Sequence, residues 1–445
     1  MIDLSPEILT AIMLGGIVLG VLTGFPVGYV IGAVGLGVGY LVFGDIIGEV
    51  LYVRAIDLMI NYILLAVPLF IFMGTMLEHS GIAEKMFEAL YVWFGGIRGG
   101  LAVTTVIIGT IVAATVGIIA ASVTMLTLVA LPTMVKRGYS KSLASGSVCA
   151  GGCLGILIPP SVMLVLYGPM ANISVGKLFF GAFIPGFLLS GLYITYILIH
   201  SYLQPKIAPA IPPEQMPDIS FGRKTVNLLA AIAPTGVLIM SVLGVIFMGI
   251  APPSEAAGMG AFVATLLTIA YGRFSFKVLK DVSLSTFRSS GFIFLLLAAA
   301  VAFVAVFIRG GGGEVVEELI IGVPGGRWGS FAVVMVIIFI LGFIIDPLAI
   351  IFIMVPIITP IAATLEFNPL WFALMVCVNF QMAFMTPPFA MAIFVCRGSV
   401  APELGVTMND IIRGVIPFVF LIMLGLGLLI IFPELILWLP GQMIK

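Results

Sequence analysis

The segment Ile107–Tyr167 decides the fold class, and its sequence is IIGTIVAATVGIIAASVTMLTLVALPTMVKRGYSKSLASGSVCAGGCLGILIPPSVMLVLY. A first apolar run ends at a small polar patch, and a second leads to the basic turn 136–139. A third run is interrupted near its middle by Gly155 and by Pro159–Ser161. Backbone groups released from a helix cannot face lipid, since each unsatisfied group there costs several kcal/mol. We therefore expect helices that break inside protein at membrane depth, which is typical of transporters.

A related pattern returns in the second half, in Phe331–Phe394, with the sequence FAVVMVIIFILGFIIDPLAIIFIMVPIITPIAATLEFNPLWFALMVCVNFQMAFMTPPFAMAIF. One apolar run reaches Gly342 and Asp346, and a later run is interrupted by the Thr-Pro-Pro sequence at 386–388. The offset is roughly 225 residues, about half the chain, which indicates two related halves. Matched glycine and proline interruptions in two halves are the best sequence indication of a transport site.

The composition belongs to a membrane protein. The chain is 62% hydrophobic and 9% charged, with a mean hydropathy of +1.29. No soluble core uses so large an apolar fraction, so several membrane crossings are expected. The net charge of −1 argues against a nucleic-acid partner. Four cysteines fall within apolar segments, where buried free thiols are favoured over a disulfide or metal site; they are Cys149, Cys153, Cys377 and Cys396.

We expect an all-α polytopic membrane protein built from two inverted-topology repeats. Each repeat contains a re-entrant hairpin, since its arms are short for a full span of about 20 residues, and a broken transmembrane helix. The expected first repeat is 1–202, with its hairpin at about 100–135 and its broken helix at about 142–170. A proline-rich cytoplasmic linker follows at 203–224, and the second repeat is 225–445, with its hairpin at about 329–362 and its broken helix at about 369–396.

Three further segments carry specific expectations. The glycine-rich helix at about 26–43 is expected to pack closely on another helix, because small residues let membrane helices approach. Charged residues at 44–61 and from Arg273 to Arg288 predict two segments along the membrane interface. A separate crossing is then expected at 291–308.

Basic residues predict the orientation. They gather at 136–141, in the linker and at 273–288, and all three groups fall on one side if re-entrant hairpins are not counted as crossings. This side is predicted to be the cytoplasm. Each half then crosses an odd number of times, which makes the halves inverted and places both termini outside.

Asp346 is the most informative single residue, since a charge at the bilayer centre costs about 2.5 to 3.5 kcal/mol. It can cap the helix that starts at Pro347, and it can also coordinate a cation. Both roles stay open, because a hairpin tip contains a helix start. The Pro-Pro breaks likewise either only interrupt a helix or free carbonyl oxygens for Na⁺ beside helix N-termini that suit an anion.

No arginine lies in sequence near either break, so no bidentate carboxylate clamp is visible. Arg54, Arg98 and Arg309 reach a site only if the fold brings them there. One competing interpretation is a stand-alone Na⁺- or H⁺-coupled carboxylate symporter without a binding protein. A membrane enzyme is disfavoured, because no metal-ligand cluster or Ser-His pair lies near the breaks.

Several motifs resemble the large membrane subunit of TRAP (tripartite ATP-independent periplasmic) transporters. They are GCLGILIPPSVMLVLYG, GFIIDPLAIIFIMVPIITPIA, NPLWFALMVCVNFQMAFMTPPFAMAIF, the basic turn MVKRGY and GKLFFGAFIPGFLL. The likeness covers nearly the whole chain. It implies a secondary transporter of the bacterial inner membrane, with no enzymatic activity and no cofactor apart from Na⁺ as coupling ion. It also implies elevator-type movement, an organic anion as substrate, a periplasmic substrate-binding protein and a separate small membrane subunit.

Carried over by position, the resemblance implies two sets of site residues. The substrate is expected to contact Pro160, Ser161, Thr386 and Pro388. Na⁺ is expected near Thr115, Gly117, Ser122, Gly155, Pro159, Gly342, Asp346 and Pro387. Many relatives carry an Asp at the first hairpin tip, but this chain has VGIIAASVT at 116–124. An ion ligand that this Asp supplies elsewhere is therefore in doubt here.

Overall fold

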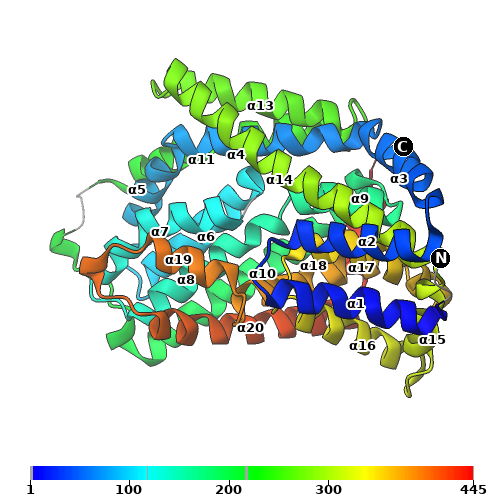
Figure 1. The fold of residues 1–445 in the computed structure, drawn as a ribbon. Helices are drawn as coiled ribbons and strands as arrows, with labels where there is room; N and C mark the ends of the chain where they lie inside the picture. Colours follow the sequence, from blue (N-terminus) through cyan, green and yellow to red (C-terminus); the bar gives the residue numbers. More distant parts are fainter. Residues whose placement is uncertain (1–3, 118, 216–218, 444–445) are drawn as a thin grey trace.

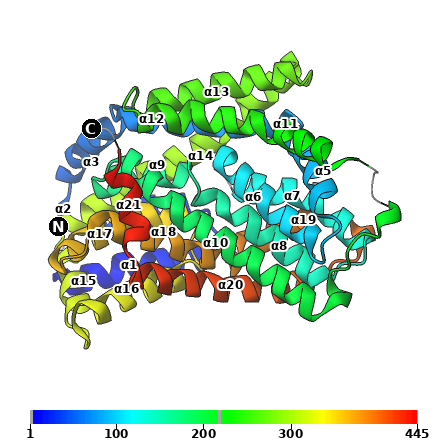
Figure 2. The same ribbon diagram turned by 180° about the vertical axis from the view of Figure 1, so that it is seen from behind.

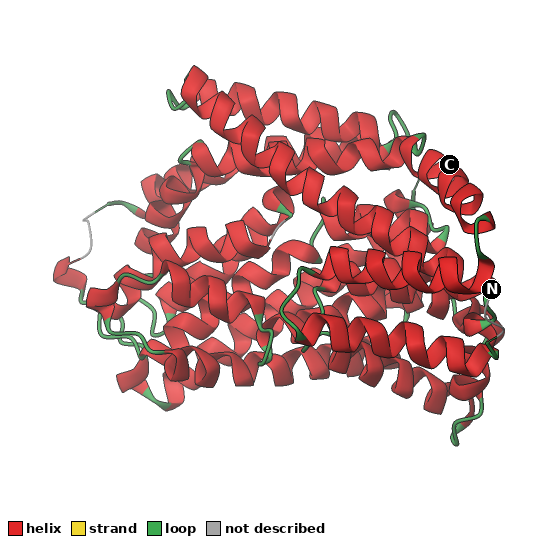
Figure 3. Ribbon diagram, in the orientation of Figure 1, coloured by secondary structure: helices red, strands yellow, loops and turns green. Residues whose placement is uncertain are grey.

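The computed structural model describes residues 4–117, 119–215 and 219–443, and every regular element in these ranges is a helix (Figure 3). Eight helical stretches there are long and apolar enough to cross a bilayer. The protein is therefore an all-α polytopic membrane protein, as its composition predicts. The eight stretches are Tyr62–His79 (with α4, Ala66–His79), α7 (Ile119–Lys136), α10 (Val175–Leu203), Phe221–Phe247 (α11, Phe221–Ile239; η5, Met240–Gly244; α12, Val245–Phe247), α13 (Pro253–Ala270), α14 (Phe276–Arg309), α17 (Pro347–Thr364) and α20 (Met408–Ile431).

The remaining helices are shorter or less apolar. They are α1 (Pro6–Leu22), α2 (Val27–Phe43), α3 (Ile46–Met59), η1 (Tyr62–Leu65), α5 (Ile82–Phe94), α6 (Gly100–Val116), α8 (Lys141–Cys153), η2 (Leu154–Ile156), α9 (Val162–Ala171), η3 (Pro205–Ile207), η4 (Pro213–Gln215), α15 (Gly312–Ile321), α16 (Gly326–Leu341), α18 (Pro369–Met385), α19 (Met391–Ser399), η6 (Pro402–Leu404) and α21 (Glu434–Gly441). Helix α21 follows the last expected crossing and was not predicted.

The helices form two parts, which Figures 1 and 2 show from opposite sides. The outer layer contains α2, α4 and α11–α14, in which α2 packs on α14 and α13 packs on α4. The hairpin bundle contains α6–α10 and α16–α20, in which α8 packs against α6, α7 and α20. Both termini lie at one end of the molecule, which we call the terminal end, and the connection between α10 and α11 lies at the opposite, linker end.

Two helical hairpins lie in the bundle. The first, α6–α7, has Gly117 at its tip with φ +64°, a left-handed conformation that glycine adopts without steric cost. The second, α16–α17, turns between Leu341 and Pro347, where Asp346 caps α17. The second hairpin starts at Gly326, three positions before the expected start.

Two helices are interrupted where the Pro-Pro sequences lie. Helix α8 ends at Cys153, the short η2 follows, and α9 starts only at Val162. Helix α18 ends at Met385, and α19 starts at Met391. Proline lacks the backbone N–H and its ring clashes with the preceding turn, so neither helix continues through. Both Pro-Pro peptide bonds are cis.

One expectation is wrong. The residues from Arg273 to Arg288 do not form an interfacial segment separate from the crossing at 291–308. From Phe276 onward they are the first turns of α14, a single helix of 34 residues. The Ser275 side chain caps it by accepting the Val278 N–H at 3.1 Å, and no glycine or proline lies between 276 and 290 to interrupt it. Arg288 therefore belongs to the wall that α14 presents to the bundle.

The linker is shorter than expected and packs against the first hairpin. Helix α11 starts at Phe221, so the connection covers 204–220, of which the residues up to 215 and from 219 are described. The N–H of Ser140 donates to the Ile207 carbonyl at 2.7 Å, and the N–H of Gly99 donates to the Ala208 carbonyl at 3.1 Å. These bonds tie the linker to the open end of the α6–α7 hairpin.

The glycine-rich helix α2 packs closely on α14, as predicted. A Cβ atom at Gly35 would lie 2.8 Å from the Cα atom of Phe303, and one at Gly28 would lie 3.7 Å from the Cα atom of Leu296. Only a residue without a side chain permits the closer of these approaches, because real Cβ atoms do not come so near to backbone.

Candidate functional site

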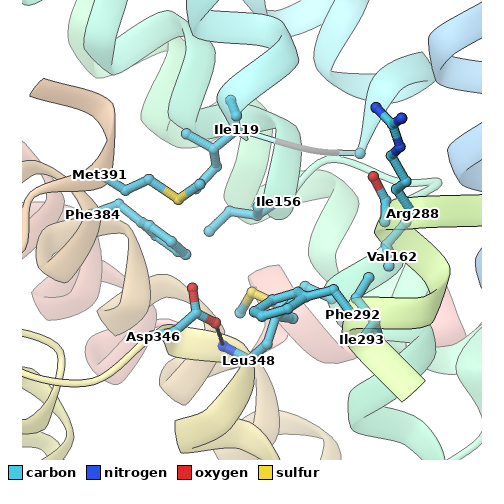
Figure 4. A pocket seen from close by; sticks show the side chains of 14 residues that line it. Ile119, Ile156, Val162, Arg288, Phe292, Ile293, Asp346, Leu348, Phe384 and Met391 are labelled. Atoms are coloured by element: carbon cyan, nitrogen blue, oxygen red, sulfur yellow. Dashed lines mark hydrogen bonds between the residues drawn. The ribbon is translucent and has the colours of Figure 1, made fainter. Parts of the chain in front are cut away.

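A cavity of about 420 Å³ lies between the hairpin bundle and α14, at the point where both hairpins and both broken helices meet (Figure 4). It is mostly apolar, with a small number of polar groups, as is usual for small-molecule sites. Its described lining residues are Gly117, Ile119, Ala120, Ile156, Val162, Met163, Arg288, Ser289, Phe292, Ile293, Asp346, Leu348, Phe384 and Met391.

Four helices begin at this cavity. Lining residues lie in the first turns of α7, α9, α17 and α19, and examples are Ile119, Val162, Leu348 and Met391. The first backbone N–H groups of a helix have no partner inside the helix, and the helix dipole adds partial positive charge there. Four such ends around one cavity create a strongly favourable environment for an anion.

Three helices also end at the same cavity. Gly117 is the C-terminal cap of α6, Ile156 ends η2, and Phe384 lies in the last turn of α18. The carbonyl groups of a last helical turn are free acceptors with partial negative charge, so they suit a cation. Helix starts and helix ends thus offer sites for both an anion and a cation within one space.

The first hairpin tip lies directly against the first break. A Cβ atom at Gly117 would be 3.3 Å from the backbone nitrogen of Val162 and 3.4 Å from the carbonyl oxygen of Pro160. Two of the sequence-predicted positions, Gly117 and Pro160, are therefore neighbours in space. The absence of a side chain at Gly117 leaves the start of α9 open to the cavity.

Asp346 contributes a carboxylate to the cavity. Its Oδ1 atom accepts the N–H of Leu348 at 2.9 Å, which is the N-cap interaction that the Asp-Pro pair predicts. Figure 4 shows the carboxyl group directed into the cavity. Within the described ranges the only ion pair is Arg54–Asp57, at 3.9 Å, so the backbone N–H at the start of α17 rather than a neighbouring cation stabilises the Asp346 carboxylate.

Arg288 on α14 is the cation that sequence reasoning missed. It lines the cavity together with Ser289 and Phe292, and it lies across the cavity from Asp346 (Figure 4). The sequence does not predict Arg288 as a residue of the cavity, because it lies among other charged residues that are all expected at a membrane interface. Once α14 is one helix, the spacing of Arg288 and Phe292 by four positions places both on one face.

The predicted hydroxyl groups donate to carbonyl groups of their own helix or of the element just before it. Thr115 donates to the Val112 carbonyl at 2.8 Å, and Thr386 donates to the Met382 carbonyl at 2.8 Å. Ser161 lies at the N-cap of α9 and donates to the Ile156 carbonyl at 2.6 Å, across the break. A hydroxyl oxygen that donates its proton keeps its lone pairs, so each can still accept or coordinate.

The other predicted positions lie near the cavity without being among its described lining residues. Ser122 is buried on α7, one turn after its start. The first break, with Gly155, Pro159 and Pro160, is fully buried, whereas Pro387 and Pro388 of the second break are exposed. A Cβ atom at Gly342 would collide with the Cβ atom of Ala383. This glycine therefore lets the second hairpin pack on α18.

Metal ligands of the usual kind are not gathered in the described part of the chain. It contains no group of three or more His, Cys, Asp and Glu residues able to bind a metal ion, and all four cysteines are buried. Na⁺ does not need such a group, since hard cations take carbonyl, hydroxyl and carboxylate oxygens. Oxygens of these three kinds lie at the hairpin tips and the breaks.

The family follows from a sequence comparison. Residues 14–435 match the model of the family described as "Tripartite ATP-independent periplasmic transporter, DctM component". The chain belongs to this family. It is a TRAP large membrane subunit, and thus a multi-pass protein of the bacterial inner membrane, in agreement with the eight apolar spans.

Curated relatives of this TRAP subunit are large permease proteins with different named substrates. A C4-dicarboxylate TRAP transporter large permease of Pseudomonas aeruginosa is 29% identical over 86% of this chain and 87% of its own. An ectoine TRAP transporter large permease of Halomonas elongata is 27% identical over 84% of this chain and 86% of its own. A sialic acid TRAP transporter large permease of Vibrio cholerae is 25% identical over 85% of this chain and 86% of its own.

Two solved structures share the fold of this TRAP subunit. The YdaH transporter of Alcanivorax borkumensis has a TM-score of 0.57 at 16% identity, over 85% of this chain and 86% of its own. MtrF of Neisseria gonorrhoeae has a TM-score of 0.57 at 13% identity, over 85% of this chain and 81% of its own. At such identities the likeness concerns architecture alone.

Proposed function

We propose that this TRAP subunit is a secondary active transporter that couples Na⁺ entry to the uptake of a small organic acid anion. The observation that carries the proposal is the convergence of four helix N-termini and Arg288 on one cavity. Helix starts and a guanidinium group both stabilise a carboxylate, and the guanidinium can bind it through two parallel hydrogen bonds. An apolar remainder of the lining suits the carbon skeleton of a small acid.

Na⁺ coupling is supported by the acceptor groups of the same cavity. The Asp346 carboxylate and the carbonyl ends at Gly117 and Ile156 are oxygen ligands of the type that Na⁺ takes. A cation beside Asp346 would offset the cost of a carboxylate at membrane depth. It would also lower the repulsion between Asp346 and an incoming anion, so the two ligands would favour each other's binding.

An inverted repeat is supported by reciprocal packing in the outer layer. Helix α2 of the first half packs on α14 of the second, and α13 of the second packs on α4 of the first. If α2 corresponds to α13 and α4 corresponds to α14, a two-fold axis that relates the two halves makes the α2–α14 contact equivalent to the α13–α4 contact. We place the repeats at 1–202 and 225–445, with the hairpins and broken helices as corresponding parts.

Elevator-type movement is the mechanism that this division favours. The hairpin bundle provides ten of the fourteen described lining residues of the cavity, and α14 of the outer layer provides the other four. The cavity is therefore formed by two bodies, and a shift of the bundle along α14 would carry its hairpin tips away from Arg288. Such a shift moves the bound anion and opens the cavity to the other side of the membrane.

We base the proposed partners and substrate class on the family. A large permease implies a small membrane subunit, and the family description implies a periplasmic component, here proposed as the binding protein that delivers the substrate. The compounds named for relatives are C4-dicarboxylates, ectoine and sialic acid. All three carry a carboxyl group, which is the group that Arg288 and the helix starts would bind.

The test is uptake into proteoliposomes that contain this chain and its small subunit. A panel of radiolabelled acids including succinate, ectoine and sialic acid would be offered with a Na⁺ gradient, with and without the binding protein. Uptake that needs Na⁺ and the binding protein is expected. Uptake without the binding protein would make the chain a conventional symporter, and uptake that ignores the Na⁺ gradient would refute the coupling.

A further inference from the structure

A second cavity lies between the two parts of the molecule, near the terminal end. It has a volume of about 410 Å³ and is lined by residues of α3 and α14 and by residues of α9 and α17. Two of its lining residues are Arg54 and Arg309. The sequence does not predict whether either arginine reaches a site. In the fold, both line the same cavity.

The guanidinium groups of both arginines remain able to bind an anion. Arg309 is the last residue of α14, and its guanidinium lies over the Phe43 ring at 5.5 Å from the centroid. Arg54 lies on α3, with its nearest carboxylate, Asp57, at 3.9 Å, and more than half of its side chain is exposed. The stacking contact orients one guanidinium without neutralising it, and the long contact leaves the other open to a second carboxylate.

The charge of this cavity is of one sign. Among its described lining residues, the charged ones are the two arginines, and the rest are apolar or proline, including Val301, Phe352 and Pro356. Acidic side chains such as Glu314 occur at the same end of the molecule but do not line the cavity. Apolar walls with two guanidinium groups match a small carboxylic acid better than a cation or a neutral sugar.

The second cavity shares the helix α14 as a wall with the cavity at the hairpin tips. Val304, Ala305, Ile308 and Arg309 of α14 line it, and Arg288 and Phe292 of α14 line the cavity at the hairpin tips. Arg288 and Arg309 are 21 positions apart on one helix, which corresponds to roughly 32 Å along its axis and about one sixth of a turn. One face of α14 thus presents two arginines to the hairpin bundle, Arg288 within the helix and Arg309 at its C-terminal end.

We infer that the cavity of Arg54 and Arg309 is a receiving site for the carboxylate of the substrate, separate from the transport site at the hairpin tips. This inference rests on the proposed function. The acid binds here after its release from the binding protein and before the hairpin tips enclose it. The apolar α14 face between the two arginines offers no further charged partner, so the anion has two resting positions.

The main test removes each positive charge without shortening the side chain greatly. Arg54→Gln, Arg309→Gln and the double variant would be reconstituted with the small subunit, and uptake would be measured in the presence of the binding protein with the acid of the panel that wild-type protein accumulates. Lys177→Gln is the matched control, since Lys177 is an exposed cation at the start of α10 and does not line the cavity. We expect uptake at limiting acid to fall about fivefold in each arginine variant, with little change at saturating acid.

The effect should also depend on charge rather than on side-chain shape. Arg309→Lys is expected to recover part of the loss, and high ionic strength should reduce the difference between wild type and Arg309→Gln. Wild-type kinetics in the Gln variants would overturn the inference while leaving the proposed function intact. If the wild-type protein accumulates no acid at all, the proposed function itself fails.

Direct occupancy is measured by chemical labelling in the absence of the binding protein. Phenylglyoxal modifies exposed arginines, and mass spectrometry would compare labelling of Arg54 and Arg309 with and without the same acid. Protection of these two but not of Arg327 is expected, and equal labelling would overturn the inference.

A phospholipid headgroup is the competing occupant. A loss that occurs in phosphatidylglycerol vesicles but not in pure phosphatidylcholine vesicles would assign the cavity to lipid and overturn the inference.

Discussion

Asp346 combines two roles at the scale of a single residue. Its side chain caps α17 through the Leu348 N–H, and its carboxylate also faces the cavity. The capping role explains why a carboxylate is tolerated at this depth, because a helix N-terminus favours negative charge. Binding a cation from the cavity requires the charge itself. An amide side chain at this position therefore keeps the capping role and removes the cation-binding role.

Asp346→Asn tests whether the charge serves Na⁺. Asn caps a helix about as well as Asp, so the variant is expected to fold with nearly unchanged stability. Loss of the charged oxygen should raise the Na⁺ concentration needed for half-maximal uptake by roughly tenfold or more, as charge-assisted contacts are worth about 1.5 to 3 kcal/mol. Uptake as a function of Na⁺ concentration measures this, with thermal unfolding in detergent as the check on stability.

The matched control is the cap of another helix in the bundle. The Asn368 side chain accepts the N–H groups of Leu370 and Trp371 at the start of α18. Asn368→Ala is expected to cost about 1 kcal/mol of stability without changing the Na⁺ dependence. Equal Na⁺ curves for wild type and Asp346→Asn would show that the carboxylate acts only as a cap.

Arg288→Gln tests the anion partner on α14. The variant is expected to raise the KM for the acid by roughly tenfold or more, with the Na⁺ dependence retained, because Arg288 and Asp346 lie on opposite sides of the cavity (Figure 4). Lys280→Gln is the control, since Lys280 is an exposed cation on the same helix and does not line the cavity. A similar KM in both variants would exclude Arg288 from substrate binding.

At the scale of elements, glycine decides how closely helices of the outer layer approach. Gly35 and Gly37 lie two positions apart on α2, but only Gly35 faces α14. A Cβ atom at Gly35 would lie 2.8 Å from Phe303, whereas one at Gly37 would have no neighbour within 4 Å. The same substitution at the two positions therefore separates packing from helix propensity.

We expect Gly35→Ala to destabilise the protein by about 1 to 3 kcal/mol, the usual cost of overpacking. Gly37→Ala should be neutral or stabilising by up to about 1 kcal/mol, because alanine favours a helix over glycine. Thermal unfolding of both variants in detergent measures the difference. Equal melting temperatures would mean that α2 and α14 can separate without cost, contrary to the close contact seen here.

At the scale of the whole molecule, the question is whether the hairpin bundle moves along the outer layer. Gly176 on α10 and Ile246 on α12 belong to different parts, and a Cβ atom at Gly176 would lie 3.3 Å from the Cγ2 atom of Ile246. Gly28 on α2 and Leu296 on α14 both belong to the outer layer and are similarly close. Cysteines introduced at either pair are expected to lie close enough to form a disulfide.

Oxidation of Gly176→Cys/Ile246→Cys is expected to abolish uptake, and reduction with dithiothreitol should restore it. Oxidation of Gly28→Cys/Leu296→Cys should leave at least half of the uptake rate, because that bond lies within one part. Radiolabelled uptake before and after oxidation measures both, with the single-cysteine variants as controls. Full uptake by the crosslinked Gly176/Ile246 pair would contradict movement between the two parts.

The helical class, the membrane location and the positions of the two hairpins and two interruptions can be predicted from the sequence alone. These properties are local, since apolar runs set the spans, and proline and glycine end helices wherever they occur. The Asp-Pro cap of α17 was also visible, because a cap depends on residues within one turn. The family resemblance rested on the same local motifs and agrees with the match over 14–435.

The sequence does not predict which cations line the cavities, because this depends on how the helices pack. Arg288 was assigned to a membrane interface until α14 proved to be one helix of 34 residues, and Arg54 and Arg309 are far apart in sequence yet line one cavity. The physical reason is that a site between two packed bodies depends on helix rotation and on contacts between distant segments. Local propensity and hydrophobic pattern constrain neither the rotation of a helix nor the contacts between distant segments. The residues that α14 presents to the bundle therefore cannot be predicted from the sequence alone.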